Sequence, residues 1–76
     1  MKNSKFEGSV KNISPTSLRI DIKKVNNKDL LIYLTGVYMP EEFLKSKLLE
    51  SYNINDVVKG NIVSESEGQF YFVELE

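Results

Sequence analysis

The C-terminal third of the chain, residues 55–75, constrains the fold more than any other stretch. It contains two runs rich in β-branched and aromatic residues, 55–63 and 70–75, and such residues favour strands. A short polar link with Gly68 joins the two runs, which is typical of a connection between antiparallel strands. The pattern therefore predicts a β-hairpin over this stretch.

The second run of the hairpin is apolar on both of its faces. Because side chains alternate between the faces of a strand, Phe70 and Phe72 lie on one side. The other side carries Tyr71, Val73 and Leu75. Only one side can point into a core, and we slightly favour the two Phe rings. In the opposite arrangement the rings form an exposed patch suited to bases or to a protein partner.

Two segments near the N-terminus show the alternation expected of half-buried strands. The apolar faces carry Phe6, Gly8 and Val10 in residues 5–13, and Leu18, Ile20 and Ile22 in residues 18–23. Glycine inside a strand suggests a bend or bulge, which barrels need in order to close. We predict turns at residues 14–17 and 26–29, because serine, proline and asparagine favour turns.

Residues 30–35 predict a third strand that is also apolar on both faces. We expect Leu30, Ile32 and Leu34 to face inward. Leu31 and Tyr33 would then face outward. Such a strand is either central in its sheet or functional on its outer side.

A short amphipathic helix of about 11 residues is predicted after the third strand. Pro40, Glu41 and Glu42 suit its first turn, because proline needs no amide partner there and carboxylates favour the positive end of the helix dipole. Asn53 is expected as a left-handed C-cap. The apolar side of this helix would comprise Phe43, Leu44, Leu48, Leu49 and Tyr52.

Three strands, a helix and two more strands predict an all-β fold with one helix. With 76 residues, the chain is expected to form a single domain over residues 1–76. The order β-β-β-α-β-β matches a five-stranded OB-fold-like barrel, whose helix between strands three and four closes one end. An SH3-like barrel is the main alternative, but it does not usually carry a helix of this length at this place.

Several short motifs resemble those of a known family. Residues 6–10 and 14–22 are similar to the opening of bacterial translation initiation factor one and related OB-fold RNA-binding domains. Residues 34–36 stand where that family closes its third strand, and residues 55–60 resemble the Gly-Asp-x-Val opening of strand four. Asn55 replaces the usual glycine of that opening. The resemblance implies an OB fold and a generic oligonucleotide-binding role.

The composition excludes several kinds of chemistry. The chain has no cysteine and no histidine, so disulfides, the usual zinc sites, and Ser/His or Cys/His catalysis are not available. No glycine-rich phosphate loop or metal-ligand spacing is present. We therefore expect no enzyme, no cofactor and no metal.

The sequence carries no sign of a membrane segment. Its longest apolar run, residues 30–34, is far shorter than the roughly 20 residues of a membrane-spanning helix. The N-terminus also lacks the apolar stretch of a signal peptide. We expect a small soluble cytoplasmic domain without a membrane among its partners.

The net charge of −1 conceals an uneven distribution. Residues 1–28 hold seven cations and two carboxylates, a balance of +5, while residues 29–76 hold three cations and nine carboxylates, a balance of −6. Such asymmetry can mark a nucleic-acid surface on the basic side. Attraction between the two halves within the fold explains it equally well.

The first hypothesis for function is a module that binds single-stranded RNA or DNA through phosphate contacts and base stacking. OB folds bind single strands on the outer face of strands two and three, where cations follow the phosphates and aromatic rings stack on bases. The candidate residues on this face and its flanks are Lys5, Lys11, Arg19, Lys23 and Tyr33.

A protein-interaction module or accessory subunit is the alternative hypothesis. It would use the C-terminal strand, with Phe70 and Phe72 as contacts, together with the acidic loop that precedes it. Glu65 and Glu67 in that loop would repel a phosphate backbone. Their charge suits a protein partner better.

Overall fold

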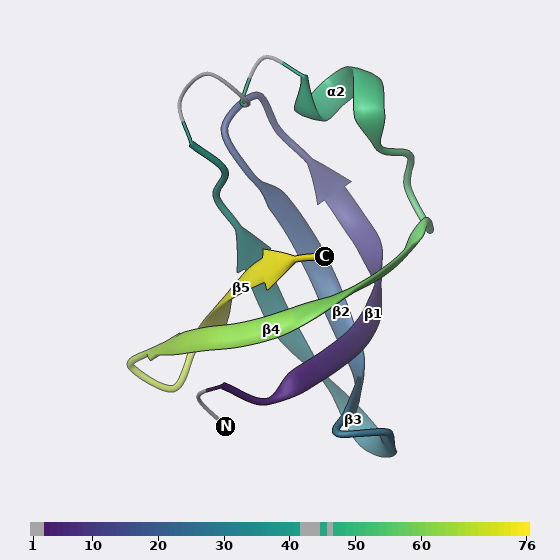
Figure 1. Ribbon diagram of the computed structural model, residues 1–76, viewed down its shortest axis with the longest axis vertical. Helices are drawn as coiled ribbons and strands as arrows, with labels where there is room; N and C mark the ends of the chain where they lie inside the picture. The colour runs from purple at the N-terminus through teal and green to yellow at the C-terminus, as the bar shows by residue number, and fades with distance from the viewer. Residues whose placement is uncertain (1–2, 42–44, 46) are drawn as a thin grey trace.

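Five strands close into a barrel in the computed structural model, which describes residues 3–41, 45 and 47–76 (Figure 1). The elements are β1 (Lys5–Ile13), β2 (Leu18–Val25), β3 (Lys28–Tyr38), α2 (Leu48–Ser51), β4 (Val57–Ser66) and β5 (Phe70–Leu75). The strands are arranged in the order β1-β2-β3-β5-β4, and β4 pairs with β1 to close the barrel. This confirms the predicted fold class and element order, and it is consistent with an OB-like fold.

The barrel closes where two glycines allow close approach of neighbouring strands. A Cβ atom on Gly8 would collide with the carbonyl oxygen of Asp21, and one on Gly60 with that of Glu74. The β1–β2 register shifts between Glu7 and Gly8, which confirms the expected bulge at this glycine. A side chain larger than hydrogen would therefore push β1 away from β2 at the first position, and β4 away from β5 at the second.

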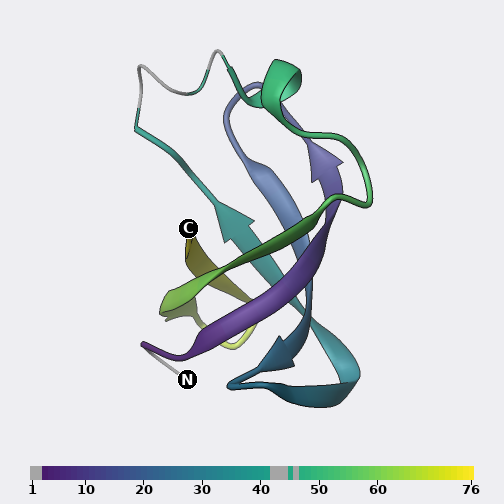
Figure 2. The same cartoon turned by 45° about the vertical axis from the view of Figure 1, so that its right-hand side comes forward.

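The core confirms the apolar faces expected for the first two strands. Its largest fully buried side chains are Val10, Leu18, Ile20, Ile22 and Ile62. Leu48 of α2 belongs to the same cluster, and α2 lies at the upper end of the barrel in Figures 1 and 2. The helix therefore contributes one leucine to the core from that end.

Part of the predicted helix lies within the described residues: Lys45 is helical, and α2 covers the four residues Leu48–Ser51. The backbone is extended at Tyr52, and Asn53 does not have a positive φ, so the C-cap expected at Asn53 is wrong. Leu49 is 58% exposed and does not join the predicted apolar face, because neighbouring residues on a helix point about 100° apart and one turn can bury only one of them. Pro40 and Glu41 precede the helix without helical structure. The predicted helical positions Glu42, Phe43 and Leu44 lie outside the described residues.

The start of β3 also departs from the sequence pattern. Ile22 pairs with Leu34 but Lys24 pairs with Asp29, so the four residues between them on β3 lie opposite Lys23 alone. This bulge interrupts the alternation. Leu30 and Leu34 pack against the core as expected, whereas the inward position predicted for Ile32 is wrong, because its side chain is 81% exposed.

The turn before β3 is tighter than predicted. It consists of Asn26 and Asn27, both with positive φ (50° and 67°), while Lys28 and Asp29 of the predicted turn already belong to β3. Two consecutive residues with positive φ are typical of two-residue hairpin turns. Asparagine tolerates this region better than most residues.

The C-terminal strand has the orientation that the sequence argument slightly disfavoured. Val73 is buried, Tyr71 and Leu75 pack against the core, and the two Phe rings lie on the outside. The reason is the parallel pairing of β3 with β5, which sets Tyr71 beside Gly36. Gly36 faces inward, since a Cβ there would meet the side chains of Ile22 and Val73. Its cross-strand neighbour Tyr71 therefore faces inward as well.

The hairpin itself is confirmed, with a shorter link. β4 continues to Ser66, and Glu67 and Gly68 both adopt positive φ before β5 begins. The amide of Gln69 donates a hydrogen bond to the carbonyl of Ser66 (2.8 Å) and closes the turn. No helix in the described part of the chain is long and apolar enough to cross a membrane.

Candidate nucleic-acid interface

The outside of β2, β3 and β5 forms one continuous surface. Because Gly36 faces inward, its neighbours Thr35 and Val37 face outward. The registers place Val37 between Arg19 of β2 and Phe72 of β5, and paired residues of neighbouring strands project to the same side. The next row joins Asp21 to Thr35. Phe70 is two residues before Phe72 and therefore lies on the same side of β5. We call this surface the outer face; it comprises Arg19, Asp21, Thr35, Val37, Phe70 and Phe72.

Two aromatic rings dominate the β5 edge of the outer face. The rings of Phe70 and Phe72 meet edge to face, with centroids 5.1 Å apart and planes at 77°, a favourable geometry for an aromatic pair. Both side chains are half-buried, and Ser66 and Ser64 of β4 lie opposite them. Each ring thus keeps a part of its surface available for a ligand.

Arg19 lies at the end of the outer face nearest the β1–β2 turn. Its side chain is exposed and lines a hollow together with Asn12, Ser14 and Ser17. The Ser14 hydroxyl accepts hydrogen bonds from the amides of Ser17 (3.1 Å) and Thr16 (3.3 Å). These bonds hold the turn in one conformation. The guanidinium is therefore accompanied by the side chains of Asn12 and Ser17, whose amide and hydroxyl groups are of the types that contact phosphates.

Asp21 is the carboxylate of the outer face, and it has a cationic partner. Lys11 Nζ lies 3.9 Å from Asp21 Oδ1, so the predicted site residue Lys11 reaches this surface from β1. Lys11 therefore offsets the negative charge of Asp21. When Arg19 and Lys23 are added to this pair, the local net charge is +2.

Lys23 and Tyr33 lie together, as the sequence hypothesis required. Lys23 Nζ lies 5.3 Å from the centroid of the Tyr33 ring, within the range of a cation–π contact. The Tyr33 side chain is 54% exposed. This pair places a cation and an aromatic ring together where β2 lies next to the first half of β3.

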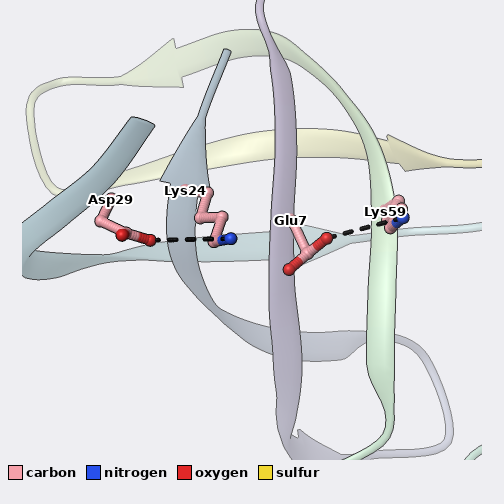
Figure 3. Close-up of polar contacts among 4 residues, drawn as sticks. All are labelled: Glu7, Lys24, Asp29 and Lys59. Carbon is pink, nitrogen blue, oxygen red and sulfur yellow. Dashed lines mark ion pairs between the residues drawn. The ribbon is translucent and has the colours of Figure 1, made fainter. Parts of the chain in front are cut away.

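Lys5 lies elsewhere on the barrel. It lines a hollow between β1, β2 and β4 with Lys24 and Lys59. Figure 3 shows the neighbouring charged residues, in which Lys24 lies 3.8 Å from Asp29 and Lys59 lies 3.6 Å from Glu7. The structure thus separates Lys5 from the other four predicted site residues.

Charges of opposite sign alternate across four strands in this second region. Glu7 of β1 is the register partner of both Lys24 on β2 and Lys59 on β4, and Lys24 is the partner of Asp29 on β3. We call Asp29, Lys24, Glu7 and Lys59 the charge ladder. It supports attraction within the fold as the explanation for part of the charge asymmetry. Sequence reasoning missed it because cross-strand neighbours depend on register.

The acidic hairpin end lies beside Tyr71 of β5. Glu65 is the register partner of Tyr71. Burial raises the pKa of the Tyr71 phenol above its usual value, and the charge of Glu65 raises it further. Glu67, at the hairpin tip, is exposed. Negative charge therefore marks the end of the hairpin next to Phe70.

The described residues contain no group of acidic side chains that could hold a metal ion. No protein-family model matches this sequence, and no curated protein matches it significantly. Function is therefore inferred from the barrel and from the chemistry of the outer face.

Proposed function

We propose that this barrel binds a short stretch of single-stranded RNA or DNA on its outer face. The observation that carries the proposal is the pair of half-exposed rings, Phe70 and Phe72, on the same surface as Arg19. Aromatic planes beside cations are the two elements that single-strand binding requires. The proposed module acts in the cytoplasm and binds without catalysis.

In the bound complex the bases stack on the two Phe rings and the phosphates contact the cations of β1 and β2. Stacking contributes about 1–3 kcal/mol per base. Arg19 with the β1–β2 turn holds one phosphate, and Lys23 holds another near Tyr33. Because Asp21 offsets the charge of Lys11, Arg19 and Lys23 predict a slope of log affinity against log salt of about −1.4 for a single strand.

The acidic hairpin end limits the length of the bound strand. Glu65 and Glu67 repel phosphates next to Phe70, so the strand leaves the surface before it reaches the β4–β5 turn. The affinity is therefore modest, and the site spans only a few nucleotides.

A protein partner on the same strand is the second candidate function. It is favoured by the acidic hairpin end beside the two Phe rings, a combination that suits a partner with an apolar patch bordered by cations. Such a partner would bind without preference for single-stranded nucleic acid. It would lose affinity when Phe72 becomes polar.

Fluorescence anisotropy with a labelled single strand of about ten nucleotides, at low and at high salt, tests the first proposal. We expect binding at low salt that weakens with the slope given above. A duplex of the same sequence should bind more weakly, because its bases are not free to stack on the rings. No binding at low salt would overturn the proposal and favour the protein partner.

A further inference from the structure

The bulge at the start of β3 exposes three large side chains that the proposed function does not use as a group. Leu31 is fully exposed, Ile32 is 81% exposed and Tyr33 is 54% exposed. Leu30 and Leu34 on either side pack against the core, so the barrel anchors both ends of this segment. We call Leu31, Ile32 and Tyr33 the apolar corner.

The apolar corner belongs to the outermost part of the molecule. In Figures 1 and 2 the first half of β3 forms the lower end of the barrel. The neighbouring Asn26–Asn27 turn folds back toward β1, where the Lys5 amide donates a hydrogen bond to the Asn26 side-chain oxygen (3.1 Å). Because the corner protrudes, it can touch a flat surface without hindrance from the rest of the barrel.

Four charged residues lie near the corner on β2 and at the start of β3, and their balance is positive. They are Lys23, Lys24, Lys28 and Asp29. Lys24 and Asp29 form an ion pair (3.8 Å), which leaves Lys23 and Lys28 to set the sign. Lys23 lies over the Tyr33 ring, so a cation and an aromatic side chain lie next to the two aliphatic residues in the chain.

We propose that the apolar corner inserts into the headgroup region of an anionic lipid surface. Aliphatic side chains at the protruding end enter the acyl boundary, and the amphipathic tyrosine stays at headgroup level, where such rings are enriched. Lysines extend their charged ends to anionic headgroups. A second copy of the chain fits this surface less well, because two corners of equal positive charge repel each other.

This contact differs from a membrane span. The expectation of no membrane rested on the length of the apolar run, and insertion into one leaflet needs only a few side chains. Binding of this kind scales with the buried apolar area and with attraction to anionic lipids. A corner of three side chains and two unpaired lysines therefore predicts weak and reversible attachment.

A tryptophan reporter tests the proposal directly, because the chain contains no tryptophan. Emission from Ile32→Trp should shift to the blue when phosphatidylcholine vesicles containing phosphatidylglycerol are added. Leu49→Trp is the matched control, since Leu49 is a similarly exposed aliphatic residue on α2, and its emission should not move. An unchanged Ile32→Trp spectrum, or equal shifts in both variants, would overturn the proposal.

Co-sedimentation with the same vesicles supplies the second measurement. Leu31→Ser/Ile32→Ser should abolish vesicle binding, and Lys28→Gln should weaken it about fivefold. Binding of the unmodified chain to pure phosphatidylcholine should be weaker than to the anionic vesicles. If Leu31→Ser/Ile32→Ser instead weakens single-strand binding and leaves vesicle binding unchanged, the corner belongs to the nucleic-acid surface and the lipid proposal is wrong.

Discussion

The charge ladder and the outer face use their cations in different ways. In the ladder, Lys24 and Lys59 alternate with carboxylates across four strands (Figure 3). On the outer face, Arg19 lies in the same row as Phe72 with Val37 between them, and the single carboxylate there is already paired with Lys11. The number of lysines on a strand therefore says less about ligand binding than the charges of their cross-strand neighbours do.

Substitution of an aromatic ring of the outer face should have the largest effect on single-strand binding. Phe72→Ser removes one stacking plane and should weaken single-strand binding by about fivefold to more than a hundredfold. Val57→Ser is the matched control, because Val57 is an exposed apolar residue on β4 outside the outer face. Anisotropy titrations of both variants measure the difference, with thermal unfolding as the check on the fold. Equal affinities would reject the outer face as the binding surface.

Tyr33 should have the next largest effect. Tyr33→Ala removes an aromatic plane and the partner of Lys23, so we expect single-strand affinity to fall by about fivefold or more. Lys47→Ala, an exposed change next to α2, should leave the affinity almost unchanged. The same titrations compare the two variants. A larger loss for Lys47→Ala would move the binding surface toward the helix.

The two kinds of cation should differ in their dependence on salt. Arg19→Gln removes one phosphate contact, so the slope of log affinity against log salt should become shallower by about 0.7. Lys59→Gln should change neither slope nor affinity, because Lys59 lies against Glu7 in the ladder. Titrations at four salt concentrations distinguish the two cases. A slope that responds equally to both substitutions would erase the distinction between the two regions.

The ladder itself should contribute little to stability. Its side chains are largely exposed, and exposed ion pairs contribute about 0–1 kcal/mol. A double-mutant cycle with Glu7→Gln and Lys59→Gln, measured by urea unfolding, should give a coupling free energy within that range. A coupling well above about 1 kcal/mol would instead make the ladder a main source of stability.

Local patterns predicted the regular parts of the barrel. The inward faces of β1 and β2 followed from simple alternation, and the bulge at Gly8 followed from a glycine inside a strand. The predicted apolar side of the helix is confirmed for Leu48, which is buried, but not for Leu49, which is exposed. Four of the five predicted site residues lie on or beside the outer face, and Lys5 lies in the hollow beside the ladder.

The sequence by itself determined the order of strands and helix along the chain, the apolar faces of the first two strands, and the lack of cysteine and histidine chemistry. These properties depend on neighbouring residues or on composition. Only the tertiary structure decided that Phe70 and Phe72 lie outside and that Ile32 is exposed. Both outcomes depend on pairing between strands: β5 is oriented by its parallel register with Gly36, and the start of β3 bulges where its pairing with β2 shifts. Where both faces of a strand are apolar, alternation cannot choose between them, and the neighbouring strand decides.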